Sequence, residues 1–448
     1  MSKKKTRKIQ DFNRAYSLLH HYVGFVVKLS YSRILHIGKE NIPEDGAVIF
    51  APNHTNTLMD ALVMLDMDRK PKVFVARADI FKNRKLAKIF TFLKIMPIMR
   101  RRDGIQAVRK NQETIEKAVD VLKDRIPFCI FPEGTHQAKY SLLPLSKGIM
   151  KIAFQAQKQM PETPLYIVPV GVTYGNFFRF RSTVRLHFGQ AINVRSFMTE
   201  RPHLVPQELM NAMRETLTDR LLSTLLYIPN DDDYNAIHEI CRATQPVVVE
   251  DMLKRKENKE KDILEVQFNA QKHILERIES IKEYDPEKLR IAIELGNDAY
   301  KKRKKLGIDI DCLSVKNPLV SRIPRIALTL VALPYAIPTS ILAIPLALLC
   351  KRLSKLLKDP AFKNSVMYLL LLLVWPLLVL AYSAIAFALL PWQWALAATI
   401  LLMPAPIVAH EIWKTMRLVA SDVKLMRKKK LRDTYSEIRK LMTDNIYL

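Results

Sequence analysis

Between residues 37 and 196 the chain alternates short apolar runs with longer amphipathic stretches. Short apolar runs are typical of buried strands, whereas apolar residues spaced three or four apart are typical of helices packed on a sheet. The predicted strands are 47–50, 72–76, 127–131, 166–172 and 184–188, and the predicted helices are 58–65, 85–93, 106–122 and 147–157. This alternation predicts an α/β domain whose mostly parallel sheet is flanked by helices.

Residues 1–36 form a separate amino-terminal segment. It starts with a basic run, 3–8, and continues with apolar residues at nearly helical spacing between 12 and 36. A basic start and aromatic content indicate a helix lying at a membrane interface. A helix that covers the sheet of the next domain fits the same pattern equally well.

Residues 197–320 are predicted to form an α-helical arm. Helix-prone stretches follow one another there, at 209–226, 249–282 and 287–305. Asp231, Asp232 and Asp233 precede one of these stretches, and three adjacent carboxylates do not readily face one metal ion. We therefore expect a loop and helix cap at this position.

Residues 321–418 are predicted to be a membrane region. Three apolar segments, 326–349, 365–390 and 394–413, are each long enough to cross a hydrocarbon core of about 30 Å. The first contains three prolines and has basic residues at both ends, whereas the turn at 391–393 has no charge. The excess of basic residues on the cytosolic side then predicts a re-entrant hairpin followed by two transmembrane helices, with a basic cytosolic tail at 419–448.

Composition narrows the range of partners. The 448-residue chain has a net charge of +27, which favours an anionic partner. No zinc-finger or RNA-binding signature is present, so an anionic membrane surface is favoured over nucleic acid. The four cysteines have no metal-binding spacing and indicate reduced thiols.

Candidate chemistry first occurs after the strand at 47–50. His54 follows a Pro-Asn dipeptide on a loop, and Asp60 lies six positions further on. An imidazole held by a carboxylate is a common general base for activating a hydroxyl. The pair alone fits a satisfied turn and a solvated aspartate just as well.

A second stretch favours the catalytic interpretation. Phe-Pro-Glu-Gly-Thr at 131–135 follows another apolar strand, and the chain presents 53–60, Arg100, 131–135 and 168–170 in that order. These blocks resemble the glycerolipid acyltransferase family, and Lys-Gly at 147–148 matches the start of a family helix. The resemblance covers roughly residues 35–195.

The spacing between His54 and Asp60 departs from the usual family pattern, because five residues separate them where four are usual. Six helical steps rotate a side chain by about 240°, so His54 must precede the helix that carries Asp60. An extra residue in the entering turn would absorb the difference. The longer spacing resembles the membrane-bound branch of the family that acylates glycerol 3-phosphate.

The resemblance implies a role for each residue in these blocks. His54 acts as the general base and Asp60 holds its imidazole. Arg100, supported by Arg101 or Arg102, is expected to bind a phosphate, because the guanidinium fork suits bidentate contacts. Without the neighbouring blocks, a surface basic cluster would be the better interpretation.

The remaining substrate-binding residues are predicted around the Phe-Pro-Glu-Gly block. Glu133 is expected either to hold the acceptor hydroxyl or to brace the site. Gly134 permits close approach of the backbone and is a candidate for the oxyanion pocket. Thr135 and Lys147 complete the predicted substrate site.

The implied function is membrane-bound acyl transfer from acyl-CoA or acyl carrier protein to a glycerol-phosphate lipid acceptor at the cytosolic face. Lysophosphatidate is the commonest acceptor in the family, and glycerol 3-phosphate is the alternative that the spacing favours. A lipid-binding scaffold without turnover is a second alternative. No metal or other cofactor is expected, and no nucleic acid partner.

Overall fold

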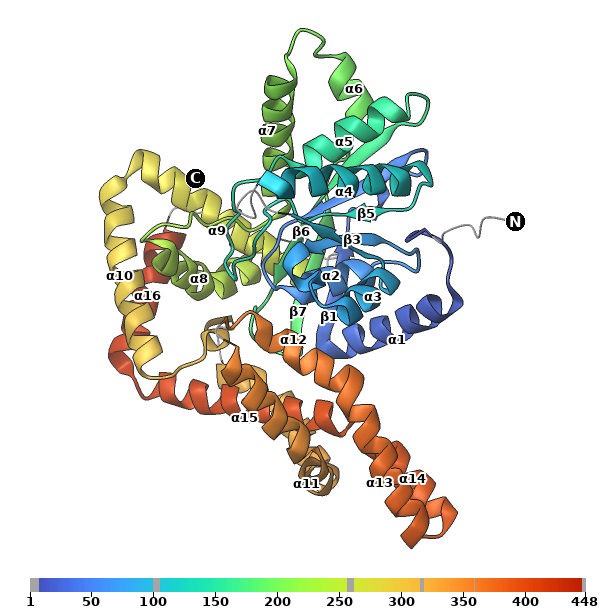
Figure 1. Cartoon of the computed structure of the whole chain (residues 1–448). Coiled ribbons are helices and arrows are strands. Elements are labelled where there is room, and N and C mark those ends of the chain that lie inside the picture. Colours follow the sequence, from blue (N-terminus) through green and yellow to red (C-terminus); the bar gives the residue numbers. More distant parts are fainter. Residues whose placement is uncertain (1–7, 100–104, 256–261, 315–317, 358, 445–448) are drawn as a thin grey trace. The chain divides into compact units, whose positions relative to one another are not determined.

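The computed structural model describes residues 8–99, 105–255, 262–314, 318–357 and 359–444 (Figure 1). The chain divides into two compact units. The first contains Met1–Leu225 and Leu353–Leu372, and the second contains Leu226–Arg352 and Leu373–Leu448.

The first unit is built on an eight-stranded sheet with the order β1-β7-β6-β2-β5-β3-β4, and β8 pairs with β6. Strands β2 to β6 run parallel, whereas β6 pairs antiparallel with β7 and β8, and β1 is parallel to β7. The strands are β1 (Tyr31–Ile37), β2 (Ala47–Pro52), β3 (Val73–Arg77), β4 (Ile95–Ile98), β5 (Phe128–Cys129), β6 (Leu165–Tyr174), β7 (Ser182–Phe188) and β8 (Ile192–Asn193). The predicted α/β fold with a largely parallel sheet is confirmed.

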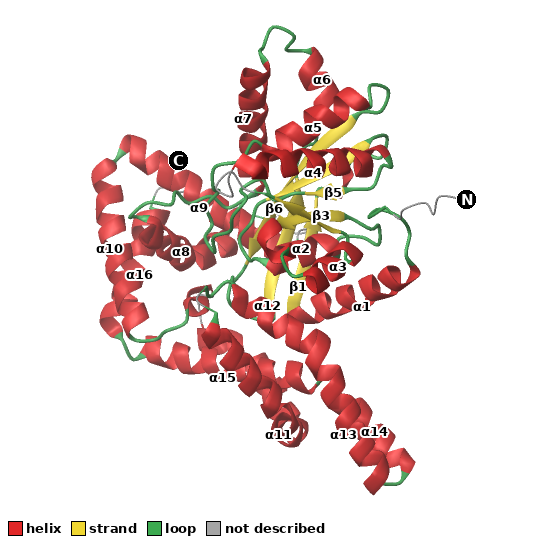
Figure 2. Ribbon diagram, in the orientation of Figure 1, coloured by secondary structure: helices red, strands yellow, loops and turns green. Residues whose placement is uncertain are grey.

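Helices flank this sheet (Figure 2). They are α1 (Arg14–Ser30), α2 (Leu58–Leu65), α3 (Arg84–Phe92), α4 (Ile105–Lys123), α5 (Gly148–Gln159), α6 (Val194–Thr199), α7 (Pro206–Thr224) and α12 (Phe362–Leu369). Strand β1 occupies the end of the segment predicted as one helix over 12–36. Its Ile34 and Leu35 pair with β7, and this long-range pairing stabilises an extended conformation there.

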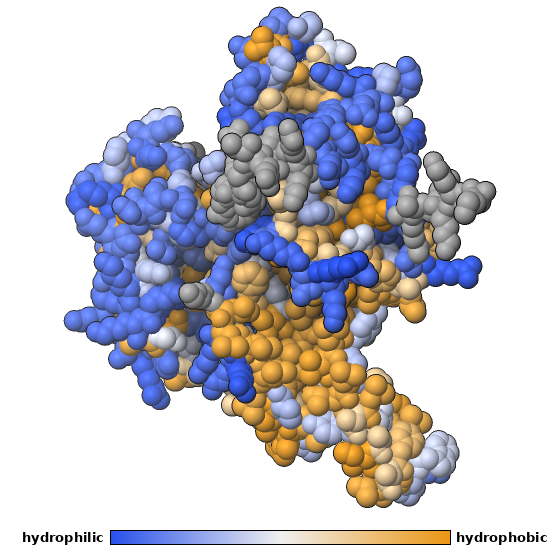
Figure 3. All heavy atoms as spheres, in the orientation of Figure 1, coloured by the Kyte–Doolittle hydropathy of each residue, from blue (hydrophilic) through white to orange (hydrophobic). Residues whose placement is uncertain are grey.

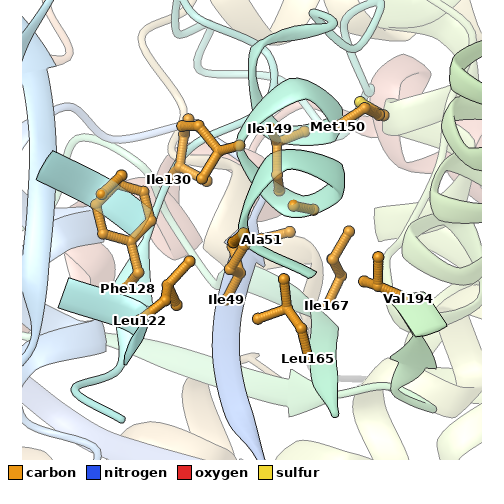
Figure 4. Close-up of a cluster of buried hydrophobic side chains, with 14 of the residues drawn as sticks. Ile49, Ala51, Leu122, Phe128, Ile130, Ile149, Met150, Leu165, Ile167 and Val194 are labelled. Atoms are coloured by element: carbon orange, nitrogen blue, oxygen red, sulfur yellow. The ribbon is translucent and has the colours of Figure 1, made fainter. Parts of the chain in front are cut away.

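The main core lies between one face of the sheet and helices α4, α5 and α7. Alternate residues of β2 point into it, so that Ile49 and Ala51 meet Leu122 from α4 and Ile149 from α5 (Figure 4). Helix α7 contributes three fully buried side chains to the same core, Met213, Leu217 and Leu221. The expected domain boundary at residue 196 is therefore too early, because the apolar face of α7 completes the core of the sheet.

The second unit contains helices α8 (Tyr234–Lys254), α9 (Ile263–Tyr284), α10 (Pro286–Lys305), α11 (Pro318–Leu356, whose last residues belong to the first unit), α13 (Trp375–Leu389), α14 (Trp392–Leu402), α15 (Ala405–Met426) and α16 (Lys429–Thr443). A buried ion pair and a tyrosine that donates a hydrogen bond to it join three of these helices. Arg303 of α10 donates to both carboxylate oxygens of Glu239 of α8, at 2.6 and 2.8 Å, and Tyr435 of α16 donates to the same carboxylate at 2.6 Å. Paired in this way, the buried charges become compatible with an apolar interior.

Two helical segments, Val320–Leu356 and Phe362–Leu389, are long and apolar enough to cross a membrane. By length and composition they make the chain a membrane protein, and Figure 3 shows the apolar surface over α13 and α14.

The expected re-entrant hairpin at 326–349 is wrong in this structure, which has one continuous helix, α11, with four prolines inside it. Each internal proline removes one backbone donor, and the remaining hydrogen bonds sustain the helix. The expected third span is also different, because α14 and α15 are separated by a break and bent by 45°.

Candidate active site

The site forms where neighbouring strands β2, β5 and β6 end. Asn53 follows β2, and its side-chain amide extends the pairing with β6 by hydrogen bonds to the backbone of that strand. Its Nδ2 donates to the carbonyl of Val172 on β6 at 3.1 Å, and its Oδ1 accepts from the Val172 N–H at 2.6 Å. The loop that follows is thereby fixed to β6 at its first residue.

His54 and Asp60 form a close pair. The distance from His54 Nδ1 to Asp60 Oδ2 is 2.8 Å, and the Asp60 side chain is fully buried. An ionised carboxylate only accepts hydrogen bonds, so Nδ1 is the N–H donor and Nε2 is the nitrogen that can take a proton. The His54 ring stacks on Phe131, with a distance of 4.4 Å between ring centroids. This is the geometry of a general base held by a carboxylate.

The longer spacing between His54 and Asp60 is absorbed by a turn before α2. Helix α2 begins at Leu58, so Asp60 lies in its first turn and His54 precedes the helix. The N–H groups of Thr55 and Asn56 donate to Asp60 Oδ2 at 2.8 and 2.6 Å. The carboxylate thus holds the backbone of the loop as well as the imidazole.

Tyr174, the last residue of β6, makes a hydrogen bond to the second carboxylate oxygen of Asp60. Its hydroxyl donates to Asp60 Oδ1 at 2.7 Å, and the side chain is fully buried. Burial, together with the nearby Asp60 charge, raises the pKa of Tyr174 well above its ordinary value, so the hydroxyl keeps its proton and remains a donor.

Glu133 braces the loop from the side of β5. Its Oε1 accepts from the His54 N–H at 2.6 Å, and its Oε2 accepts from the Leu143 N–H at 2.9 Å. Burial raises the pKa of Glu133 to about 7, although the two N–H donors act to lower it. Because each oxygen accepts from a backbone group, the geometry favours the bracing role over contact with an acceptor hydroxyl.

Among the other predicted substrate residues, the structure describes Gly134, Thr135 and Lys147. Gly134 adopts φ +67°, a conformation that favours glycine, but its N–H donates to the Phe131 carbonyl at 3.1 Å. That N–H is therefore already used by a turn, which weakens its predicted place in an oxyanion pocket. Thr135 is exposed, and Lys147 lies directly before α5. Arg100, Arg101 and Arg102 lie outside the described residues.

Three residues of the site were missed as site residues by sequence reasoning. Asn53 directly follows β2, Tyr174 is the last residue of β6, and His136 follows the Phe-Pro-Glu-Gly-Thr run. The ring centroid of His136 lies 5.5 Å from that of His54, and its Nε2 lies 2.8 Å from Asp359 Oδ2. Only Asn53 and His136 had a local signal, because Asn53 lies in the block at 53–60 and His136 directly follows the block at 131–135.

Comparison with known proteins adds an independent line of support. Residues 33–173 match the family described as Acyltransferase. A stretch of 139 residues is 31% identical to "Glycerol-3-phosphate O-acyltransferase 2" of Saccharomyces cerevisiae, and covers 31% of this chain and 19% of that protein. Residues 33–173 therefore match an acyltransferase domain.

Two further similarities involve a relative from Mycoplasma pneumoniae and a solved structure from Thermotoga maritima. A stretch of 191 residues is 24% identical to "Probable 1-acyl-sn-glycerol-3-phosphate acyltransferase" of Mycoplasma pneumoniae, and covers 42% of this chain and 64% of that protein. The crystal structure of the 1-acyl-sn-glycerophosphate acyltransferase PlsC from Thermotoga maritima aligns with a TM-score of 0.35 and 21% identity, over 48% of this chain and 83% of that one. The chain spans less than a fifth of the yeast relative and less than two thirds of the Mycoplasma relative.

The raised pKa of Glu133 predicts a pH-dependent contribution to stability. The folded protein holds this proton more tightly than the unfolded chain, whose carboxyl has the ordinary value of 4.5. The contribution is fully present below about pH 4.5 and is lost as the pH rises through about 7. Glu133→Gln should remove this part of the pH dependence and leave a flatter profile of unfolding free energy between these values.

The measurement is denaturant unfolding of both proteins over this pH range, with Glu208→Gln as the control because Glu208 is exposed. Parallel pH profiles for wild type and Glu133→Gln would contradict the assignment.

Proposed function

We propose that the chain transfers a fatty acyl group from a thioester donor, acyl-CoA or acyl carrier protein, to a hydroxyl of a glycerol-phosphate acceptor. The observation that carries this proposal is the His54–Asp60 pair at 2.8 Å, at the end of a buried strand in an acyltransferase domain. The pair can activate a hydroxyl without forming a covalent acyl-enzyme.

In the proposed reaction, Nε2 of His54 takes the proton of the acceptor hydroxyl as its oxygen attacks the thioester carbonyl carbon. The imidazolium that forms is stabilised by the buried Asp60 carboxylate. When the C–S bond breaks, the leaving thiolate receives the proton from the imidazolium and departs as a thiol. The product is an ester, and His54 returns to its neutral form.

Two acceptors fit the proposal. Glycerol 3-phosphate is favoured by the five-residue spacing between His54 and Asp60 and by the name of the Saccharomyces relative. Lysophosphatidate is favoured by the name of the Mycoplasma relative. Arg100 remains the predicted phosphate ligand for either acceptor.

The purified protein should form labelled ester when it is supplied with labelled acyl-CoA and either acceptor in separate reactions. His54→Ala should lower turnover by about 10²–10⁴-fold, the usual contribution of general-base catalysis. Arg100→Ala should raise the KM for the phosphorylated acceptor much more than the KM for the acyl donor, because it removes a ground-state phosphate contact. His203→Ala, a change to an exposed histidine, is the control.

A wild-type rate in His54→Ala would contradict the mechanism. No turnover with any thioester donor or either acceptor would instead favour a lipid-binding scaffold. An equal change in both KM values would contradict the assignment of Arg100 as a ligand of the acceptor phosphate.

We also propose that the first unit contacts an anionic membrane surface through helices α1 and α3. Helix α1 packs one face on α2 and exposes Leu18, Tyr22 and Phe25 at helical spacing on another. Helix α3 buries none of its residues and exposes Leu86 and Ile89 beside basic side chains, which are Arg84, Lys85 and Lys88. Apolar and basic groups on one short helix favour anionic lipid interfaces.

The two helices are held together and lie beside the start of a membrane helix. Tyr16 of α1 meets Phe92 of α3 edge to face, with 6.4 Å between ring centroids. The Tyr22 hydroxyl donates to the Leu372 carbonyl at 2.7 Å, and the Tyr368 hydroxyl donates to the Val23 carbonyl at 3.2 Å. The proposed surface therefore adjoins residues 368–372 of the same unit.

An environment-sensitive fluorophore on Ile89→Cys, in a background without the native cysteines, should report an apolar environment in vesicles that contain anionic lipid. The same fluorophore on Val205→Cys is the control, since Val205 is an exposed apolar residue of the same unit. Equal emission from the two positions would contradict a membrane contact at α3.

We propose that the acyltransferase domain faces the cytosol. The four free cysteines and the basic residues Lys351, Arg352 and Lys355 in the last turns of α11 support this orientation. A cysteine at exposed Gln207, in the background without native cysteines, should react with a membrane-impermeant thiol reagent only after the cells are permeabilised. Labelling of intact cells would contradict the cytosolic orientation of the acyltransferase domain.

A further inference from the structure

The loop between His54 and Asp60 contains a strained residue. The N–H of Met59 donates to the Asn56 carbonyl at 3.0 Å and closes a tight turn. Thr57 lies inside that turn with φ 49° and ψ −121°, a conformation in which glycine is strongly preferred and a β-branched residue is unfavourable. Thr57 therefore stays in this conformation only because surrounding contacts hold it.

Those contacts come from the segment that begins the second membrane helix. The hydroxyls of Thr57 and Ser365 share a hydrogen bond of 3.0 Å, and the Thr57 hydroxyl also lies 3.4 Å from the Ala361 carbonyl. Ala361 and Ser365 are 2% and 3% exposed, so this contact is sealed from solvent.

A second contact joins the same two segments through one acceptor. The carbonyl of Phe177 receives the side-chain amide of Asn56 at 3.0 Å and the side-chain amide of Asn364 at 2.6 Å. Asn56 comes from the loop and Asn364 from α12, so the shared carbonyl ties their positions together. Asp359 also contacts His136, whose ring lies 5.5 Å from that of His54.

We propose that residues 359–365 clamp the loop that carries His54, and that Thr57, Asn364 and Ser365 are positioning residues for the reaction. This inference rests on the proposed acyltransferase function. None of the three residues is proposed to touch the reacting atoms. They act by keeping the backbone between His54 and Asp60 in the turn that lets Nδ1 reach the carboxylate.

The position of the clamp gives it a second consequence. Residues 362–365 open the apolar segment Phe362–Leu389, so one helix both enters the membrane region and holds the catalytic loop. Displacement of a catalytic group by about 1 Å can cost about 100-fold in rate. Insertion of this helix in the membrane is thus linked to the geometry of His54.

The test compares Ser365→Ala and Asn364→Ala with wild type. Each change removes a side-chain hydrogen bond of the clamp, and kcat should fall by about tenfold while the KM for the acyl donor stays the same. Ser383→Ala is the matched control, since Ser383 lies further along the same membrane segment and bonds to the carbonyl of Val379 in its own helix.

Rescue separates positioning from general damage. Glycine adopts a positive φ without strain, so Thr57→Gly should need the clamp less, and Ser365→Ala should lower kcat much less in that background. A full kcat for both Ser365→Ala and Asn364→Ala would overturn the proposal. The proposal would also be overturned if Ser365→Ala lowered kcat by the same factor in the wild-type protein and in Thr57→Gly.

Failure of the proposed function gives a different result. If wild type shows no turnover, hydrogen exchange of residues 54–60 still tests the clamp. Faster exchange in Ser365→Ala than in Ser383→Ala would support the clamp, and equal exchange would overturn it.

Discussion

The site depends on one buried carboxylate, that of Asp60. A charge with no solvent access is tolerated only when hydrogen-bond donors surround it. Here the donors are the His54 ring, the N–H groups of Thr55 and Asn56, and the hydroxyl of Tyr174. The need to satisfy Asp60 therefore sets the tautomer of the imidazole, the path of the loop and the end of strand β6 at the same time.

The parallel sheet explains why these groups meet. Strand β2 lies between β5 and β6, and all three run in the same direction. Residues that follow parallel neighbours emerge at one edge of the sheet. His54 follows β2, Glu133 follows β5 and Tyr174 ends β6, so residues 79 and 114 positions away from their partners in the chain reach a single loop.

The first unit also contains segments from well beyond the family match. Helix α7 completes the core of the sheet, and α12 packs against α1 and α2. Both lie outside residues 33–173, so the matched segment alone lacks part of the core and part of the packing around the loop that carries His54.

The sequence by itself determined the α/β class and the helix at 58–65, because periodicity is a local property. The pairing of His54 with Asp60 was indicated only by the resemblance of the short motifs to a known family. Tertiary structure alone decided that β1 is a strand, that Tyr174 holds Asp60 and that the first membrane segment is one continuous helix. Each of these depends on a partner distant in the chain or on the balance between internal prolines and the remaining helical hydrogen bonds. A local sequence pattern carries no information about such distant partners. The contact between Asp60 and Tyr174 therefore follows only from the pairing of β2 with β6 in the folded sheet.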